Sequence, residues 1–202
     1  MTSRGSIVLD LGCGTRKTPG AIGADRVPAP GVDVVCDLNA GLPFAEASVE
    51  KVILNHVVEH LDDLTAAMHE VWRVCRPGGT VRIWTPHFSS GLASWSDPTH
   101  KRTCTSRTFE YFQPQNNSHY VRARFHIQAM RLHYKLGGAG QASPRLRHWL
   151  DHQLGRLLER WANRNRINIQ RAERFVSRLI PFEELYVELR AEKNSAAVCP
   201  QP

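Results

Sequence analysis

Three aspartates in the first 40 residues each end a short apolar segment, and the first stands beside a glycine-rich turn. Asp10 precedes Gly12-Cys13-Gly14, while Asp25 and Asp37 end AIGAD and VDVVCD. Glycines let a backbone approach a ligand closely, and carboxylates accept hydrogen bonds from its hydroxyl or N–H groups. Taken singly, the turn could be an ordinary strand–helix connection and each acid a helix cap. The ordered set of three acids beside one turn favours a ligand-binding site.

A second group of side chains that can accept protons or bind anions follows residue 85. It comprises PHFSS at 86–90 and DPTHKR at 97–102. A histidine has an ordinary pKa of about 6.5, so His87 or His100 could accept a proton from a substrate, with Asp97 orienting His100. Lys101 and Arg102 add positive charge that could hold an anionic substrate. The alternative is a loop ordered by its own hydrogen bonds.

His56-Val57-Val58-Glu59-His60 has the H-x-x-E-H spacing of inverted zinc proteases. Zinc binding there requires both histidines on one face of a helix and a third protein ligand. His56 instead comes directly after a predicted strand. We therefore expect His60 to cap or pack against the start of a helix, and we expect no metal.

Alternating strand-like and helix-like segments position these residues. Strands are expected at 6–11, 21–25, 32–37, 49–55, 80–85, 121–135 and 185–189, and helices at 61–75, 106–112 and 144–179. The helix at 61–75 ends at Arg76-Pro77-Gly78-Gly79, because proline blocks its continuation and glycine accepts a left-handed turn. This alternation predicts an α/β fold with a parallel sheet and ligand sites at the carboxyl ends of its strands.

The segment VLDLGCG resembles the first motif of class I S-adenosylmethionine-dependent methyltransferases, and the chain is similar to the type 11-like members of that family. The likeness runs in order over residues 6–88, through LPFAEASVEKVILNHVVEHLDD and RVCRPGGTVRIWTPH. It implies a Rossmann-like sheet, mostly parallel with an antiparallel final strand, and a helical and loop insertion in the C-terminal half. It also implies S-adenosyl-L-methionine as the cofactor and S-adenosyl-L-homocysteine as the product.

The resemblance assigns a set of positions to the cofactor site: Asp10, Gly12, Gly14, Lys17, Asp25, Asp37, Leu38, Asn55 and His56. The glycines would approach the methionine part of the cofactor, Asp25 would accept the ribose hydroxyls, and Asp37 would lie at the adenine. Lys17 would pair with the cofactor carboxylate, unless it belongs to a solvated loop. His56 would face the cofactor or the acceptor.

The chain departs from the family in the lengths of its first connections. The intervals from Asp10 to Asp25 and from Asp25 to Asp37 are too short for full crossover helices. One face of the sheet is therefore expected to be thinly covered. The long basic segment or a second subunit would be available to cover it.

Charge is unevenly distributed along the 202 residues, whose formal net charge is +7. Residues 100–180 carry 16 Lys and Arg against 4 Asp and Glu. Such a segment suits an anionic partner such as a phosphorylated metabolite, RNA or an acidic lipid surface, or else forms solvated arginine-rich helices. The five cysteines show no C-x-x-C pair, which is typical of reduced thiols in a cytoplasmic protein. No apolar run is long enough to span a membrane.

We expect one methyltransferase domain over 1–193, with a cofactor-binding half at 1–88, an acceptor lid and basic helical insertion at 89–180, and a last strand at 183–191. Residues 194–202 would form a mobile tail. The expected reaction is methyl transfer to an oxygen or nitrogen of a small anionic metabolite, such as a sugar or natural-product intermediate. Phe109, Tyr111 and Phe112 would line the acceptor pocket or belong to the core.

Two alternative functions and one expectation about the oligomeric state remain. The basic segment at 100–180 would suit an RNA methyltransferase, although no RNA-binding module is evident. A protein that keeps the cofactor fold without catalysis is a third possibility, against which the intact glycine turn and acids argue. The apolar face of the helix around Trp149 and Trp161 favours a homodimer.

Overall fold

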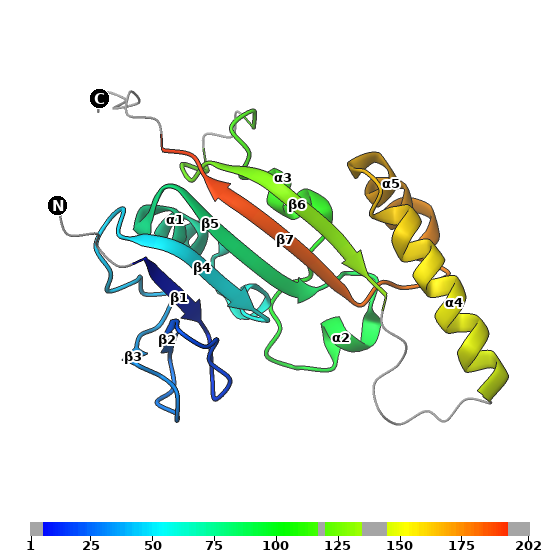
Figure 1. The fold of residues 1–202 in the computed structure, drawn as a ribbon, viewed down its shortest axis with the longest axis horizontal. Helices are drawn as coiled ribbons and strands as arrows, with labels where there is room; N and C mark the ends of the chain where they lie inside the picture. Colours follow the sequence, from blue (N-terminus) through cyan, green and yellow to red (C-terminus); the bar gives the residue numbers. More distant parts are fainter. Residues whose placement is uncertain (1–5, 117–119, 135–144, 194–202) are drawn as a thin grey trace.

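The computed structural model describes residues 6–116, 120–134 and 145–193. These residues form a seven-stranded sheet in the order β3-β2-β1-β4-β5-β7-β6 (Figure 1). The strands are β1 (Ile7–Leu11), β2 (Ile22–Asp25), β3 (Val34–Val35), β4 (Val49–Asn55), β5 (Cys75–Pro86), β6 (Phe125–His133) and β7 (Glu184–Ala191). β7 runs antiparallel to β5 and β6, and the other neighbouring pairs are parallel. The predicted α/β fold with an antiparallel final strand is confirmed.

The helices are concentrated after β4. They are the 3-10 helix η1 (Val58–His60), the α-helices α1 (Leu64–Val74), α2 (Gly91–Trp95), α3 (Ser106–Glu110), α4 (Arg145–Ala162) and α5 (Arg166–Arg171), and the π-helical turn η2 (Ala172–Val176). The Asp63 carboxylate caps α1 by accepting from the backbone N–H groups of Thr65 and Ala66. Turns and bends, but no helix, connect β1, β2 and β3. The short intervals predicted this.

Several predicted boundaries were wrong. The strand expected at 32–37 is only Val34–Val35, and the strand expected at 80–85 begins at Cys75, directly after α1. The single helix expected at 144–179 is divided, because Asn165 caps a new helix by accepting from the N–H of Asn168. Cys199 and the expected tail at 194–202 lie outside the described residues.

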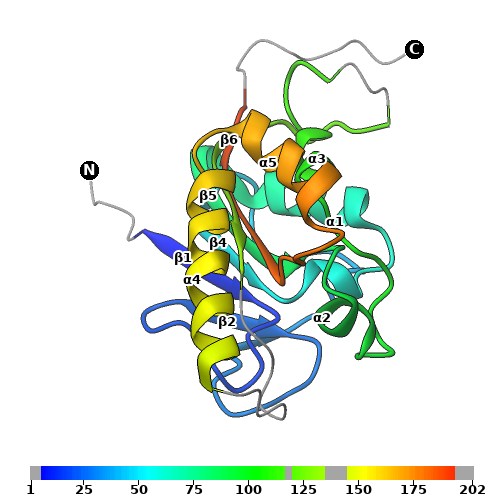
Figure 2. The ribbon, with the colours of Figure 1, turned by 90° about the vertical axis from the view of Figure 1, so that its right-hand side faces the viewer.

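One face of the sheet holds the core. Alternate residues of β5 and β7, among them Val81, Ile83, Val187 and Leu189, are fully buried in one cluster with the apolar side of α1. Alternation of this kind follows from the two-residue repeat of a strand. The helices α1 and α3 lie on this side in both views (Figures 1 and 2).

No helix of the described residues covers the opposite face of the sheet (Figures 1 and 2). Side chains of this face bond to one another: the Glu188 carboxylate accepts from Arg82 Nε at 2.7 Å and from the Tyr186 hydroxyl at 2.8 Å. Trp84 packs against Tyr186 with ring centroids 4.7 Å apart. The thin cover expected from the sequence is therefore present as a polar, half-buried surface.

The basic helical segment does not cover that face; it follows the β6 edge of the sheet (Figure 1). The Asn163 side chain pairs with the backbone of Leu132 like a neighbouring strand, accepting from its N–H and donating to its carbonyl, both at 2.8 Å. Glu159 accepts from the N–H of Tyr134 in the same row. These contacts satisfy backbone groups of an edge strand that would otherwise be unpaired.

Candidate active site

The turn after β1 is held by the end of β2. Gly12 has a φ of +67° and donates its N–H to the carbonyl of Ala24 at 2.7 Å. The Asp25 carboxylate accepts from the N–H groups of Gly14 at 2.9 Å and Val27 at 3.0 Å. Asp10 is almost fully buried and accepts from the N–H of Thr18 at 2.7 Å. Asp10 and Asp25 thus fix the shape of the loops that follow β1 and β2.

A cleft opens at the carboxyl ends of β1, β2 and β4. Its walls are formed by Leu11, Gly12, Ala24, Asp25, Arg26, Cys36, Asp37, Leu38, Asn39, Leu42, His56, Val57, His60, Leu61 and Thr99. Its walls combine apolar side chains with a few polar and charged groups, as in small-molecule sites. The position agrees with the rule that ligands of such sheets bind beyond the carboxyl ends of the strands.

Five of the nine residues predicted for the cofactor line this cleft: Gly12, Asp25, Asp37, Leu38 and His56. Asp10, Gly14, Lys17 and Asn55 do not line it. Lys17 Nζ instead bonds the Asp33 carboxylate at 2.7 Å, so the chain itself already pairs this cation. Asp10 and Gly14 instead stabilise the turn through hydrogen bonds with Thr18 and Asp25.

Residues that the sequence did not single out complete the walls. Cys36, Asn39 and Leu42 come from the loop after β3, and His60 and Thr99 come from two separate segments. The H-x-x-E-H spacing marked His60, although it was expected to be structural. No sequence pattern marked Thr99 as its neighbour.

His56 has an unusual backbone and a strongly perturbed charge. Its φ is +55°, a left-handed conformation that side chains other than glycine rarely adopt, and its N–H donates to the Trp84 carbonyl at 2.9 Å. Hydrogen bonds to Glu184 at 3.0 Å and Glu59 at 3.2 Å raise the pKa of His56 to about 9. His56 is therefore cationic at neutral pH, and its two ring N–H groups donate to these two carboxylates, so it is not available as a base.

The DPTHKR loop docks on the turn that carries His60. Thr99 Oγ1 lies 2.9 Å from His60 Nδ1, and the N–H of Lys101 donates to the Glu59 carbonyl at 2.8 Å. Arg102 donates to the carbonyl of Asp62 at 2.9 Å, and the Lys101 ammonium pairs with the Asp62 carboxylate. The two cations expected to hold an anionic acceptor are thus bonded to the neighbouring turn.

Docking of this loop brings His100 to His60. The two rings are 4.7 Å apart, edge to face. His100 Nδ1 lies 2.9 Å from the Ser94 carbonyl, and its Nε2 lies 3.9 Å from the Asp97 carboxylate, which was expected to orient it. His100 does not line the cleft itself, but His60 does.

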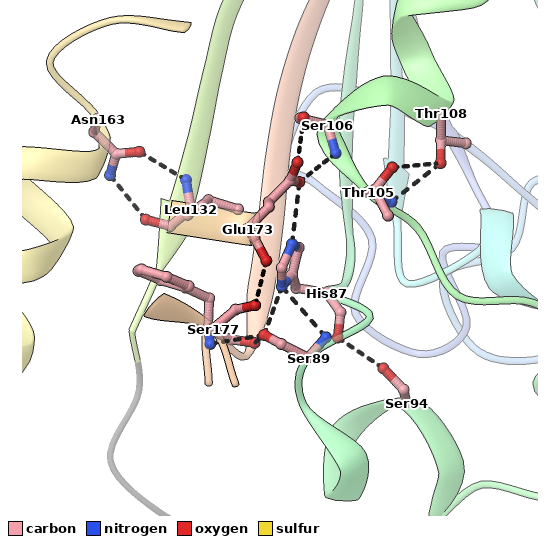
Figure 3. A network of polar contacts seen from close by, with 11 residues as sticks. His87, Ser89, Ser94, Thr105, Ser106, Thr108, Leu132, Asn163, Glu173 and Ser177 are labelled. Carbon is pink, nitrogen blue, oxygen red and sulfur yellow. Dashed lines mark hydrogen bonds and ion pairs between the residues drawn. The ribbon is translucent and has the colours of Figure 1, made fainter. Parts of the chain in front are cut away.

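His87 lies in a network of polar contacts with Ser89, Ser106 and Glu173 (Figure 3). It is fully buried, with Nδ1 2.7 Å from Ser89 Oγ and Nε2 3.2 Å from the Glu173 carboxylate. Glu173 also accepts from the N–H and hydroxyl of Ser106, both at 2.6 Å. This network joins η2 to α3, which favours a structural role for His87. Phe109 and Phe112 are likewise buried in the core, whereas Tyr111 is exposed.

An ion pair beneath the cleft gives a pH-dependent prediction. The Glu70 carboxylate accepts from Arg73 Nε at 2.8 Å and from the N–H of Leu42 at 3.0 Å, and Arg73 lowers the pKa of Glu70 to about 2. Because the folded pKa lies below the unfolded one, the stabilisation is complete above pH 4.5 and is lost as the pH falls towards 2. Glu70→Gln is expected to lower the free energy of unfolding by about 1–2 kcal/mol at pH 6 and by roughly half as much at pH 3.

Urea unfolding followed by circular dichroism at both pH values measures the difference. Glu50→Gln is the matched control, because Glu50 pairs with Arg76 at 2.6 Å on the surface, where ion pairs contribute little. If Glu70→Gln lowers the free energy of unfolding equally at pH 6 and pH 3, the charge of Glu70 is not the source of the stabilisation.

The strand order and the cleft beyond the strand ends are those of class I methyltransferases. A solved S-adenosylmethionine-dependent methyltransferase from Archaeoglobus fulgidus superposes with a TM-score of 0.57 and 19% identity, over 92% of this chain and 86% of that one. Residues 17–83 match the family model described as a methyltransferase domain. The fold is that of class I S-adenosylmethionine-dependent methyltransferases, and the family match, over about a third of the chain, supports the class that the sequence predicts.

Two curated relatives match shorter segments. A protein of Mycolicibacterium smegmatis described as a probable S-adenosylmethionine-dependent methyltransferase is 39% identical over 80 residues, which are 38% of this chain and 31% of the relative. The ubiquinone/menaquinone biosynthesis C-methyltransferase of Desulfotalea psychrophila is 40% identical over 55 residues, 27% of this chain and 22% of the relative. The chain therefore covers less than a third of the length of either protein. Within the described residues, no helix is long and apolar enough to cross a membrane.

Proposed function

We propose that the protein transfers a methyl group from S-adenosyl-L-methionine to a small acceptor, releasing S-adenosyl-L-homocysteine. The observation that carries the proposal is the cleft with Gly12, Asp25 and Asp37 on its walls. A side chain at Gly12 would collide with Val57, so only glycine leaves this wall open. Two carboxylates on adjacent walls fit a ligand with hydroxyl groups at one end and an adenine at the other.

The chain's own residues bind and orient the ligands. Asp25 accepts hydrogen bonds from the ribose hydroxyls, while Asp37 and Leu38 hold the adenine. When bound, the cofactor supplies an electrophilic methyl group on a positively charged sulfur. The protein then has to align the acceptor for in-line displacement and exclude water.

His60 and His100 are the groups that we propose to assist an oxygen acceptor. His60 lies on the cleft wall and His100 packs against it, whereas His87 is buried in its own network. Of the predicted catalytic residues, Asp97 and His100 therefore remain in the proposal. A neutral amine acceptor would need less help.

The basic residues around the cleft are the basis for an anionic acceptor. Arg26 lines the cleft, whereas Lys101 and Arg102 are bonded to the turn at 58–62 and His56 is paired with Glu59 and Glu184. We propose a sugar or natural-product intermediate that carries a carboxylate or phosphate. A biosynthetic reaction in the cytoplasm is part of this proposal.

RNA is the second candidate acceptor. The arginines of the helical segment at the β6 edge are solvent-exposed, including Arg156, Arg160, Arg164, Arg171, Arg174 and Arg178. Such a row would contact phosphates in a salt-dependent manner. Release of S-adenosyl-L-homocysteine with small anionic metabolites but not with total RNA would favour the first candidate. Cofactor binding without turnover on either would favour the non-catalytic alternative.

Replacing Asp25 tests the cofactor site. Asp25→Ala removes an acceptor for the ribose hydroxyls and for the turn, and is expected to weaken S-adenosyl-L-methionine binding by about 1–3 kcal/mol. Isothermal titration calorimetry measures the affinity. Glu46→Ala is the control, since Glu46 is an exposed acid that pairs with Lys193 at 3.7 Å outside the cleft. Unchanged affinity in Asp25→Ala would exclude this role.

We propose a homodimer formed through the helical segment. Leu154, Leu157 and Ile167 on α4 and α5 are each about half exposed or more, at 49%, 59% and 62%. Exposed apolar side chains on one helical segment are typical of an interface. Light scattering is expected to give about twice the 22.8 kDa of the chain, and a monomer mass at micromolar concentration would contradict the dimer.

A further inference from the structure

Three side chains that commonly bind metals meet beside the cleft. Glu59 and His60 come from the turn after β4, and His100 comes from the DPTHKR loop. One ligand atom from each lies within 4.8 Å of those of the other two. We propose that Glu59, His60 and His100 bind a divalent first-row transition metal such as Zn²⁺. The proposal concerns metal binding and does not depend on methyl transfer.

The hydrogen bonds of the two histidines leave the correct nitrogen for a metal. The Thr99 hydroxyl donates to the Asp97 carboxylate at 2.6 Å, so its oxygen accepts from His60 Nδ1–H at 2.9 Å. His100 Nδ1–H donates to the Ser94 carbonyl at 2.9 Å. Both rings therefore keep a lone pair on Nε2. Metal-binding histidines are typically fixed in this way, by a carbonyl or a carboxylate-linked group on the opposite nitrogen.

Glu59 is fixed in the same manner. Its side chain is 1% exposed, and its carboxylate accepts from Thr85 Oγ1 at 3.1 Å and from His56 at 3.2 Å. Each carboxylate oxygen has two acceptor sites and takes part in one of these bonds, so one site on each oxygen remains for a metal. The Asp97 carboxylate, 3.9 Å from His100 Nε2, adds negative charge beside the cluster and favours a bound cation.

The ligand set points to the class of metal. Two imidazoles and one carboxylate suit Zn²⁺, Fe²⁺ and Co²⁺, whereas Ca²⁺ and Mg²⁺ prefer oxygen ligands only. Ligand bonds of about 2.0–2.2 Å require the side chains to close in by about 1 Å from their present separation. Three protein ligands leave coordination positions open, and His60 and Thr99 on the cleft wall place them beside the acceptor.

The arrangement differs from the zinc-protease interpretation of H-x-x-E-H. His56, the first histidine of that motif, is bonded to Glu59 and Glu184 and is not part of the cluster. The glutamate is a ligand here, and the third ligand comes from a distant loop. Pairing of the loop with the turn through Thr99 and Lys101 is what assembles the set.

Cobalt titration tests the site with a readout independent of catalysis. The full chain, stripped with a chelator, is titrated with Co²⁺ while its visible absorption is recorded. One equivalent is expected to give d–d bands that Zn²⁺ abolishes. His60→Ala and His100→Ala are each expected to weaken Co²⁺ binding at least 100-fold, and Thr99→Val about 10–100-fold, because it removes only the group that orients His60.

His126→Ala is the matched control. His126 is an exposed histidine of β6 that pairs with Glu192 and does not belong to the cluster. The control variant is expected to bind Co²⁺ like the unmodified protein. Circular dichroism confirms that each variant is folded, with His60→Gln and His100→Gln as substitutes if an alanine variant is not. Absence of cobalt bands, or bands unchanged in folded His60 and His100 variants, would overturn the site. Calorimetry with S-adenosyl-L-methionine on the same samples would show separately whether the cofactor proposal stands.

Discussion

Replacement of His100 by alanine is expected to lower the turnover number about 10²–10⁴-fold, the range typical of losing proton transfer at a reacting group. The expectation holds whether His100 accepts the proton itself or holds a metal that acidifies the acceptor. Affinity for S-adenosyl-L-methionine is expected to stay within about 3-fold, because His100 does not line the cleft. Release of S-adenosyl-L-homocysteine, with an acceptor found by screening small anionic metabolites, measures turnover.

His87→Ala is the informative companion to His100→Ala. Its buried network joins the segments at 87–89, 106 and 173, so its loss is expected to lower the melting temperature and leave the turnover of folded enzyme nearly unchanged. A loss of turnover in folded His87→Ala, with normal turnover in His100→Ala, would identify His87 as the proton acceptor. Near-normal turnover in both folded variants would show that the acceptor is already nucleophilic without a histidine.

Gly12→Ala is expected to weaken S-adenosyl-L-methionine binding more than 10-fold. An added Cβ would lie 2.4 Å from Val57 Cγ2, and the φ of +67° is unfavourable for alanine. Since Gly12 and Val57 both line the cleft, relief of the collision must displace one of its walls. Calorimetry of cofactor binding measures the effect.

Two further variants separate the collision from backbone strain. Gly20 has a similar φ of +78° but open space around its Cβ position, so Gly20→Ala is expected to leave cofactor affinity nearly unchanged. Val57→Ala removes the colliding methyl groups and is expected to restore much of the affinity in the double variant with Gly12→Ala. Equal losses in the Gly12 and Gly20 variants would attribute the effect to strain alone.

Local patterns predicted the elements whose surroundings are simple. The apolar runs of β1 and β4 were located within one residue because both strands are buried in the middle of the sheet. β3 was overestimated because only two residues pair at the sheet edge, and this depends on β2. The helix expected at 144–179 was divided because the side chains of Asn163 and Asn165 bond to backbone groups, a choice that apolar spacing does not reveal.

In the candidate site, too, the residues fixed by local structure were predictable and those brought together by tertiary contacts were not. The glycine turn and Asp25 were predictable because a strand end determines where they point. The meeting of His60 with His100 was not, because it depends on a loop that crosses to another turn through Thr99 and Lys101. His87 and His100 looked equivalent in sequence, but their partners separate them: His87 bonds to Ser89 and Glu173, whereas His100 packs against His60 on the cleft wall.

In the described residues no helix lies between β1, β2 and β3, so a bound ligand is expected to stabilise the loops that connect these strands. The loops that form three walls of the cleft are held by a few hydrogen bonds, such as those of Asp25 to Gly14 and of Asp37 to Asn39. Amide hydrogens there should exchange with solvent far faster than those of β4 and β5, which are protected by neighbours on both sides. An occupant that bridges these loops would slow that exchange. Part of its binding energy is then spent on ordering its own site.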